Sequence, residues 1–519
     1  MARILTLPAS RSFLATLAEG LLEGRVVPGY APRGDAFALA RATVFLPTRR
    51  ACRAFADALL EAEGGKATLL PRIVPLGDVD EDALAFSEDA PLLAAPHAVT
   101  PAARRIVLSA LIARWRGALA EGAGQAAVAA GPAATFALAD ALAHLFDDFT
   151  TAGVDLSRLK GLVPQEHDPY FDLSLDFLRI ARAAFSAHLA EQGLVEPAAR
   201  REALVSAEAR RLEALGAAAG PVIAAGSTGS LPATARLIAT ISRLPQGAVV
   251  LPGLDLVMED EAFARLTDDA DAAPDHPQYG LARLLGGLDV ARRDVEELAP
   301  PERPARERLV SEAMRQAETS DLWASLPARL DGEARGVAMA DVSVVEADDP
   351  REEALAIALL LRESLERDGE TAALITPDRD LARRVASELE RFGVKVDDSA
   401  GTPLGETGPG RLARQIAQVA AASLAPVPLF ALLTHPLACL GLELAAKAEA
   451  VAALELAILH GPRPRPGTDG LLAALNAFDP DDLYRRDPRR RLTDRALEAA
   501  RTLAERLKDE AVVALVGLS

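Results

Sequence analysis

The chain has 519 residues, of which 50% are apolar and 25% are charged, so it is too long for one hydrophobic core and too apolar for a disordered protein. A formal net charge of −19 argues against a protein that binds nucleic acid over its whole surface and leaves only local basic grooves for that purpose. The two cysteines, Cys52 and Cys439, are too few for a disulfide framework or a cysteine-built metal centre, and they fit a reducing cytosol.

The first 97 residues are predicted to begin a parallel α/β layer. Apolar strands at Arg3–Leu7 and Thr43–Leu46 each lead into a polar turn and a helix, and these helices are expected to end near Leu22 and Leu60. The run Leu69–Asp78 is expected to return the chain to the sheet. Parallel neighbours need a helical crossover, so this alternation indicates a parallel sheet.

The turn after the first strand lacks the residues of a phosphate-binding loop. Such a loop uses glycines, whose backbone amides wrap the phosphates, and a Gly-Lys-Ser/Thr sequence whose lysine meets the charge. The turn contains neither glycine nor lysine. Of the five lysines in the chain only Lys66 follows a glycine, and Ala67 comes next, so the sequence has no such loop anywhere.

Residues 98–215 are predicted to be a helical insertion, and residues 216–293 resume the α/β pattern with strands at Pro221–Ala225 and Gly247–Leu251. The loop after the first of these strands, Gly226–Gly229, has no lysine or metal-binding carboxylate, so a tight turn is favoured over an anion site. The pair Asp260-Glu261 faces no nucleotide loop and is predicted to lie on a helix surface.

Residues 294–337 are charged and rich in Pro and Arg, which favours a connector with one or two surface helices. Residues 338–404 are then predicted to form a second α/β layer. Its helices are expected from Arg351 to about Arg367 and after Pro377, and its strands at Val342–Glu346, Ala372–Ile375 and Val394–Val396.

Residues 405–519 are predicted to be helical. The segment Val419–Leu442 is apolar enough to suggest a membrane span, but Pro426, Pro428 and Pro436 interrupt it, so short buried helices are favoured.

The amino-acid sequences of several segments resemble those of a known family. Ile375–Arg383 and Val396–Gly401 are similar to the AddB family, the helicase-like subunits of the AddAB double-strand-break repair complex in the form found in alphaproteobacteria. Leu69–Asp78, Asp275–Gly280 and Phe430–Leu437 also match that family. The resemblance covers the N-terminal half of such a protein, and it implies superfamily 1 helicase-like, RecA-type parallel sheets with large helical insertions, helix-rich overall.

The resemblance also implies a division into helicase domains. Residues 1–97 and 216–293 would form the two halves of domain 1A, and residues 98–215 a 1B-like insertion. Residues 294–337 would be a connector, residues 338–404 the start of domain 2A, and residues 405–519 a truncated 2B-like insertion.

By resemblance, residues at the strand ends have two kinds of role. The candidates for the path of single-stranded DNA are Thr48, Arg49, Arg50, Arg379 and Arg383. The positions of a degenerate nucleotide site are Ser10, Arg11, Ser12, Gly226, Ser227, Thr228, Gly229 and Thr376, the last standing where the family presents an arginine. A working motor also places Asp-Glu for Mg²⁺ after the strand that here ends in Ala224-Ala225.

The expected function is that of a non-hydrolysing scaffold in recombinational repair of DNA double-strand breaks. The family is a helicase–exonuclease subunit, but no lysine here has an acidic residue two positions before it, so the PD-(D/E)xK nuclease motif is missing and no catalytic residue or metal ligand is assigned. ATP and Mg²⁺ would be handled by an AddA-like partner in a cytoplasmic heterodimer acting on DNA ends, and the chain would be a fragment of a longer protein. A protein–protein adaptor with no DNA role, or a nucleotide hydrolase with a divergent loop, stays open.

Overall fold

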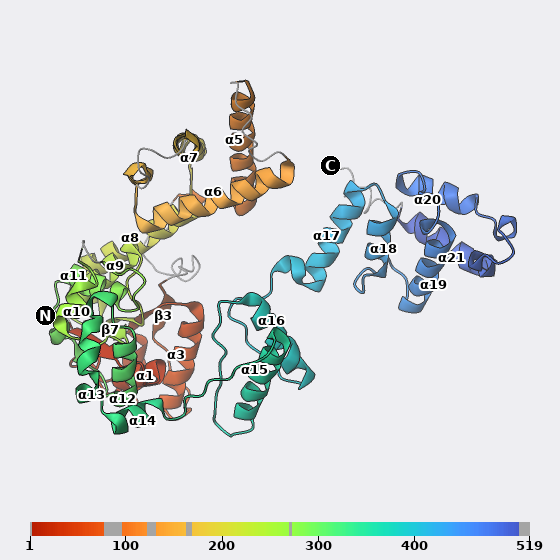
Figure 1. The fold of residues 1–519 in the computed structure, drawn as a ribbon. Coiled ribbons are helices and arrows are strands. Elements are labelled where there is room, and N and C mark those ends of the chain that lie inside the picture. The colour runs from red at the N-terminus through yellow and green to blue at the C-terminus, as the bar shows by residue number, and fades with distance from the viewer. Residues whose placement is uncertain (1–2, 77–95, 122–130, 162–168, 269–271, 508–519) are drawn as a thin grey trace. The chain divides into compact units, whose positions relative to one another are not determined.

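A computed structural model describes residues 3–76, 96–121, 131–161, 169–268 and 272–507 (Figure 1). The protein is helix-rich, with 60% of residues helical, and contains a six-stranded parallel sheet, as expected for an α/β fold. The chain divides into two compact units, residues 1–343 and 344–519, and each is described by itself.

The sheet of the first unit has the strand order β3-β2-β6-β7-β1-β8, and every neighbouring pair is parallel. Five of its strands lie where apolar runs predicted them, and these predictions are confirmed. The sixth, β8, pairs with β1 at Leu5 and Thr6 and lies inside the stretch predicted to be a connector. The bounds are β1 Arg3–Leu7, β2 Thr43–Leu46, β3 Arg72–Pro75, β6 Val222–Ala225, β7 Gly247–Pro252 and β8 Glu296–Glu297.

Helices cover both faces of this sheet because successive strand residues point to opposite sides. Leu5 and Val250 face a core shared with α1 (Phe13–Leu22) and α3 (Arg49–Ala62). Ile4 and Val249 face the other core, which α8 (Pro197–Leu215), α9 (Pro232–Arg243) and α11 (Tyr279–Leu288) complete. In Figure 1 α1 and α3 lie together, and α9 to α11 form a separate group.

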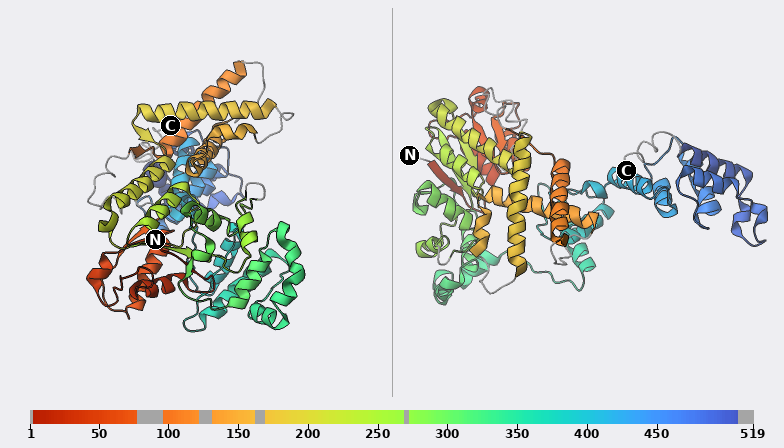
Figure 2. Two further views of the ribbon diagram at one scale, coloured as in Figure 1. Left: turned by 90° about the vertical axis from the view of Figure 1, so that its left-hand side faces the viewer. Right: turned by 90° about the horizontal axis from the view of Figure 1, so that it is seen from above.

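The predicted helical insertion is present between β3 and β6, and Figure 2 shows its helices in orange and yellow. Inside it the buried Arg104 donates to Asp147 (2.7 Å) and Glu196 (3.1 Å), and Glu196 also pairs with Arg182 (2.6 Å). A buried ion cluster of this kind fixes which helices pack together, because an unpaired member would be costly. The elements are β4 His97–Ala98, α5 Pro101–Glu121, α6 Pro132–Ala152, α7 Pro169–Glu191 and β5 Leu194–Val195.

The connector is more firmly packed than its composition predicts. Its helices are α12 (Pro304–Ala313), α13 (Leu326–Arg329) and α14 (Gly332–Met339). The buried Glu312 of α12 pairs with Arg315 (3.0 Å) and Arg329 (2.6 Å), and Glu259 pairs with the same two arginines. Burial works against ionisation of Glu259, but its hydrogen bonds and the two positive charges lower its pKa. The remaining helices of the first unit are α2 Ala36–Ala40 and α10 Asp260–Arg265.

The second unit corrects one prediction. The two helices of the predicted α/β layer are present as α15 (Pro350–Leu365) and α16 (Arg379–Arg391), packed through Ala358 and Val385. The three strands predicted beside them, 342–346, 372–375 and 394–396, form no strand pairs in the described chain, so the second parallel sheet is missing there. Val344 is 86% exposed and Ile375 94% exposed, and a buried parallel strand needs a paired neighbour and cover on both faces.

The rest of the second unit is helical, as predicted, and packs around residues such as Leu433, Leu454 and Leu503. No helix in the described ranges combines the length and the hydropathy that crossing a bilayer requires. The helices are α17 Gly408–Ala421, α18 Pro426–Thr434, α19 Leu444–Leu454, α20 Gly467–Asn476 and α21 Asp494–Arg506.

Candidate functional site at the carboxyl edge of the sheet

The central strands of the first unit end at one edge, where a crevice of about 530 Å³ opens. Pro8 follows β1, Pro47 follows β2, Gly226 follows β6 and Gly253 follows β7, and all four line this crevice. The chain leaves β2 toward β3 but leaves β6 toward β7, so the crossover direction reverses between these two neighbours. Ligands of open α/β sheets bind at such a reversal, which makes the crevice the candidate site.

The structure brings together the two turns that the sequence assigned to a degenerate nucleotide site. Arg11, from the turn between β1 and α1, lines the crevice together with Gly226 and Thr228, from the turn between β6 and α9. Ser12 is the residue before α1, and its side chain makes no capping hydrogen bond. Thr376 belongs to the second unit, where its hydroxyl accepts a hydrogen bond from the Asp378 amide.

A carboxylate of the chain itself binds the first of these turns. Glu307 of α12 accepts two hydrogen bonds through Oε1, from the Ser10 amide (2.9 Å) and from the Ser10 hydroxyl (2.5 Å). The Ser10 hydroxyl oxygen in turn accepts from the amide of Glu302 (2.9 Å). Backbone amides before a helix are the groups that hold phosphate in nucleotide-binding folds. Here the anion on that amide is Glu307.

Arg11 is likewise engaged within the protein. Its Nε donates to the carbonyl of Pro300 (2.8 Å), and its Nη1 donates to the carboxylate of Glu302 (2.9 Å). The connector residues 300–307 are therefore joined to the turn after β1 by hydrogen bonds and an ion pair. A phosphate would therefore have to compete with Glu302 for the Arg11 guanidinium.

The glycines of the second turn are explained by backbone conformation and packing. Gly226 has φ +75° and Gly229 has φ +62°, a region that other residues rarely adopt. A Cβ at Gly229 would lie 2.8 Å from Cδ1 of the buried Leu284. The hydroxyl groups of Thr228 and Ser230 hydrogen-bond to each other (2.6 Å), and the Ser227 hydroxyl accepts from the Gly229 amide (3.2 Å). This turn has the geometry of a strand-to-helix connection held by its own side chains.

Two features of a Mg²⁺-ATP site are not seen in the crevice within the described residues. No lysine is among the described residues that line it, and the amide that could receive a phosphate is bound to Glu307. Asp260 and Glu261 begin α10, where the exposed Asp260 is ion-paired with Arg292 (2.5 Å), as predicted for a helix surface. Within the described ranges no three His, Cys, Asp or Glu side chains cluster as a metal site would require.

The first group of DNA-path candidates begins α3, directly after β2. Thr48 is its N-cap and accepts from the Ala51 amide (3.1 Å), so the helix start is well formed. Arg49 and Arg50 are exposed, and both take part in interactions within the protein. Pro47 and Ala51 on either side line the crevice. The three candidates thus lie beside the crevice, at a helix N-terminus that suits a phosphate.

The second group of DNA-path candidates lies in the second unit and is paired with acidic residues. Arg379 binds Asp398 in a two-pronged contact (3.1 and 2.5 Å), and this hydrogen bonding raises the pKa of Arg379. Arg383 pairs with Asp380 and lies 3.5 Å from Glu406. A phosphate would have to compete with these carboxylates for both guanidinium groups.

Two residues central to this geometry could not be found from the sequence. Glu302 and Glu307 lie in a charged run, Glu302–Arg308, which is typical of a solvated surface segment. No spacing signal links Glu307 to Ser10, because 297 positions separate them.

Comparison of the sequence with protein-family models and with curated proteins gave no match. The fold and the chemistry of the crevice are therefore the basis for a functional proposal.

Proposed function

We propose that this chain is a non-hydrolysing, helicase-like scaffold of an AddB-type subunit, acting in recombinational repair of DNA double-strand breaks. In this proposal it pairs with an AddA-like helicase–nuclease subunit in the cytoplasm. The partner binds ATP and Mg²⁺ and drives movement, while this chain guides DNA ends and single-stranded DNA.

The observation that carries the proposal is the hydrogen bond from the Ser10 amide to Glu307. A motor domain of this strand–turn–helix form would keep that amide available and would add a lysine for the phosphates. In this chain a carboxylate binds the amide, and the neighbouring Arg11 is paired with Glu302. Charge repulsion between Glu307 and a triphosphate would add to the loss of binding.

The guiding role rests on the α3 start. Thr48, Arg49 and Arg50 combine a hydroxyl, two guanidinium groups and the positive end of a helix dipole. Such a set suits the phosphates of single-stranded DNA. With a net charge of −19 on the chain, any such contact has to be local.

The experiment that tests the guiding role measures the anisotropy of a fluorescent oligothymidylate against protein at several salt concentrations. Wild type is expected to bind at low salt, and Arg49→Ala/Arg50→Ala is expected to bind more weakly. Loss of two phosphate contacts lowers the slope of log K against log salt by about 1.4.

The matched control is Arg243→Ala/Arg293→Ala. These two arginines are also exposed, but they lie at the other end of the sheet, where α9 ends and β8 begins. The control is expected to bind like wild type. If the Arg49/Arg50 variant keeps the wild-type salt slope, the DNA role at this edge is wrong and the adaptor interpretation is favoured.

A further inference from the structure

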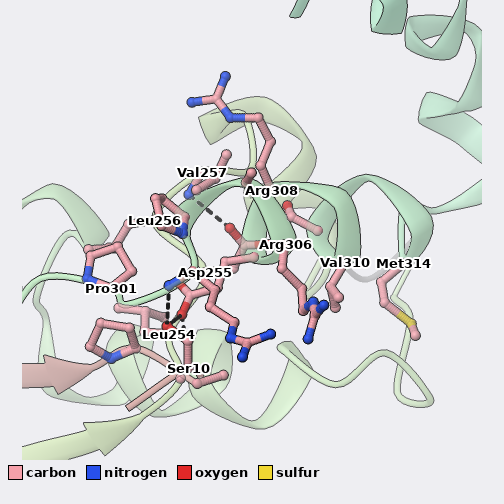
Figure 3. A pocket seen from close by; sticks show the side chains of 18 of the residues that line it. Ser10, Leu254, Asp255, Leu256, Val257, Pro301, Arg306, Arg308, Val310 and Met314 are labelled. Atoms are coloured by element: carbon pink, nitrogen blue, oxygen red, sulfur yellow. Dashed lines mark hydrogen bonds between the residues drawn. The ribbon is translucent and has the colours of Figure 1, made fainter. Parts of the chain in front are cut away.

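A second and larger cavity, of about 800 Å³, lies between the strand ends and the connector helices, and we call it the connector cavity. Its floor is made by the residues after β1 and β7, including Ser10 and Leu254. Val310 of α12 and Met314, the residue after that helix, form a wall (Figure 3). It shares Pro8, Gly253 and Gln278 with the crevice. Its volume is in the range of sites for small organic ligands.

The connector cavity gathers apolar side chains that are left half-exposed. Val257 is 43% exposed, Val310 50% and Met314 49%, and all three line it. Leu254 and Leu330 line it as well and are buried. Apolar side chains that converge on one hollow offer a surface for an apolar ligand body, and a methionine adapts to its shape.

The hydrogen-bond acceptors of the cavity are largely used within the protein. Asp255 Oδ1 accepts from the amides of Val257 and Met258, each at 2.8 Å. Glu307 accepts from Ser10. The Gln278 side chain accepts from the Asp255 amide and donates to the Gly253 carbonyl. A ligand that brings donors would therefore find few acceptors besides the carboxylate of Glu297.

Two of the arginines that line the cavity make few contacts within the described part of the protein. Among the described residues, the Arg303 guanidinium is ion-paired only with Asp341, at 3.6 Å, and the Arg303 side chain is 52% exposed. Arg308, at the outer rim in Figure 3, is exposed and has no hydrogen bond or ion pair with any residue that the structure describes. In Arg306, two of the three guanidinium nitrogens donate hydrogen bonds to the carbonyls of Ala338 and Ala340. The polar groups that remain available to a ligand are therefore mainly positively charged hydrogen-bond donors.

We propose that the connector cavity binds a small organic anion with an apolar body. The apolar part would lie against Val257, Val310 and Met314, and the anionic group would lie at the rim by Arg303 and Arg308. This inference is independent of the proposed DNA role, because it uses neither Arg49 nor Arg50.

The test uses the full chain and two fluorescent probes with related aromatic bodies. Anilinonaphthalene sulfonate carries a charge, and N-phenylnaphthylamine does not. The sulfonate is expected to bind with one site per chain, and the neutral probe several-fold more weakly. Decanoate is expected to displace the sulfonate, whereas decanol at the same concentration is not.

Variants locate the site. Arg303→Glu/Arg308→Glu is expected to weaken the sulfonate by about tenfold or more, because charge-assisted contacts are lost, and to leave the neutral probe unchanged. Val310→Asp is expected to weaken both probes. Glu297→Gln, which removes a lining carboxylate, is expected to tighten the sulfonate.

Two control variants distinguish binding at this site from nonspecific binding of the probes elsewhere on the surface. Arg243→Glu/Arg293→Glu makes the same change in net charge at the other end of the sheet, and Leu60→Asp places the same carboxylate on the exposed face of α3. Both are expected to bind the probes like wild type. Equal binding of the two probes to wild type, or sulfonate binding that survives both Val310→Asp and the arginine reversal, would overturn the proposal.

Discussion

At the scale of single residues, the turn after β6 shows how one backbone position constrains the edge of the sheet. Gly229 combines a left-handed φ with close approach to Leu284, which is only 3% exposed. An added methyl group cannot be accommodated there without moving a buried side chain.

Gly229→Ala is therefore expected to destabilise the first unit by about 1–3 kcal/mol, through backbone strain and overpacking. The measurement is the urea midpoint of unfolding followed by circular dichroism. Gly286→Ala is the control, because Gly286 lies inside α11 with nothing near its would-be Cβ. It is expected to be neutral or stabilising by up to about 1 kcal/mol. Equal stability of the two variants would contradict the packing argument.

At the scale of elements, α16 depends on its N-cap. Asp378 accepts hydrogen bonds from the amides of Asp380 (2.8 Å) and Leu381 (3.2 Å). The hydrogen bonds from Leu381 and Asp380 lower the pKa of Asp378 below its ordinary value of 3.8. A lowered pKa in the folded state means that the ionised cap stabilises the helix above pH 3.8, and that this contribution is lost as the pH falls below that value.

Asp378→Asn is therefore expected to open α16 more often at neutral pH, and its difference from wild type is expected to shrink as the pH falls below 3.8. Hydrogen exchange measured by mass spectrometry on peptides from 379–391 reports this locally. Asp368→Asn, in the exposed turn after α15, is the control and is expected to leave exchange in α16 unchanged. A difference that stays constant with pH would rule out the charge of Asp378 as the cause.

Whether an apolar segment forms a strand also depends on the neighbours with which it can pair. The strands β1, β2, β6 and β7 are paired and covered on both faces, so their apolar runs become buried strands. The segments at 342–346 and 372–375 are also largely apolar, but they have no strand partners in the described chain. Strand formation is a property of the pair and not of the segment.

At the scale of the whole molecule, the proposed scaffold role makes a simple prediction about nucleotide. The full chain alone is expected neither to bind Mg²⁺-ATP in equilibrium dialysis at millimolar concentration nor to hydrolyse it. Glu307→Ala frees the Ser10 amide, but it is expected not to restore binding, because no lysine lines the crevice in the described residues.

The outcome that contradicts this prediction is specific. ATP binding by the wild type that is lost in Arg11→Ala would favour a nucleotide hydrolase with a divergent loop. DNA binding and ATP binding are separate measurements, so either can fail without deciding the other. Probe binding in the connector cavity is separate from both.

Local patterns in the sequence were enough to locate five strands of the first sheet and the helices around them. These follow from local apolar periodicity and from turn residues such as Pro47 and Gly226, which act over a few positions. The sequence also shows that no Gly-Lys-Ser/Thr loop is present, because that motif is defined by residue identity alone.

The tertiary structure was needed to show that Glu307 binds Ser10, that β8 joins β1, and that Leu254 and Val310 share one cavity. It also decided that the segments near Val344 and Ile375 do not pair in the described chain. These contacts join residues far apart in the chain, and their free energy depends on which partners are present. No local pattern of residues encodes such a partner.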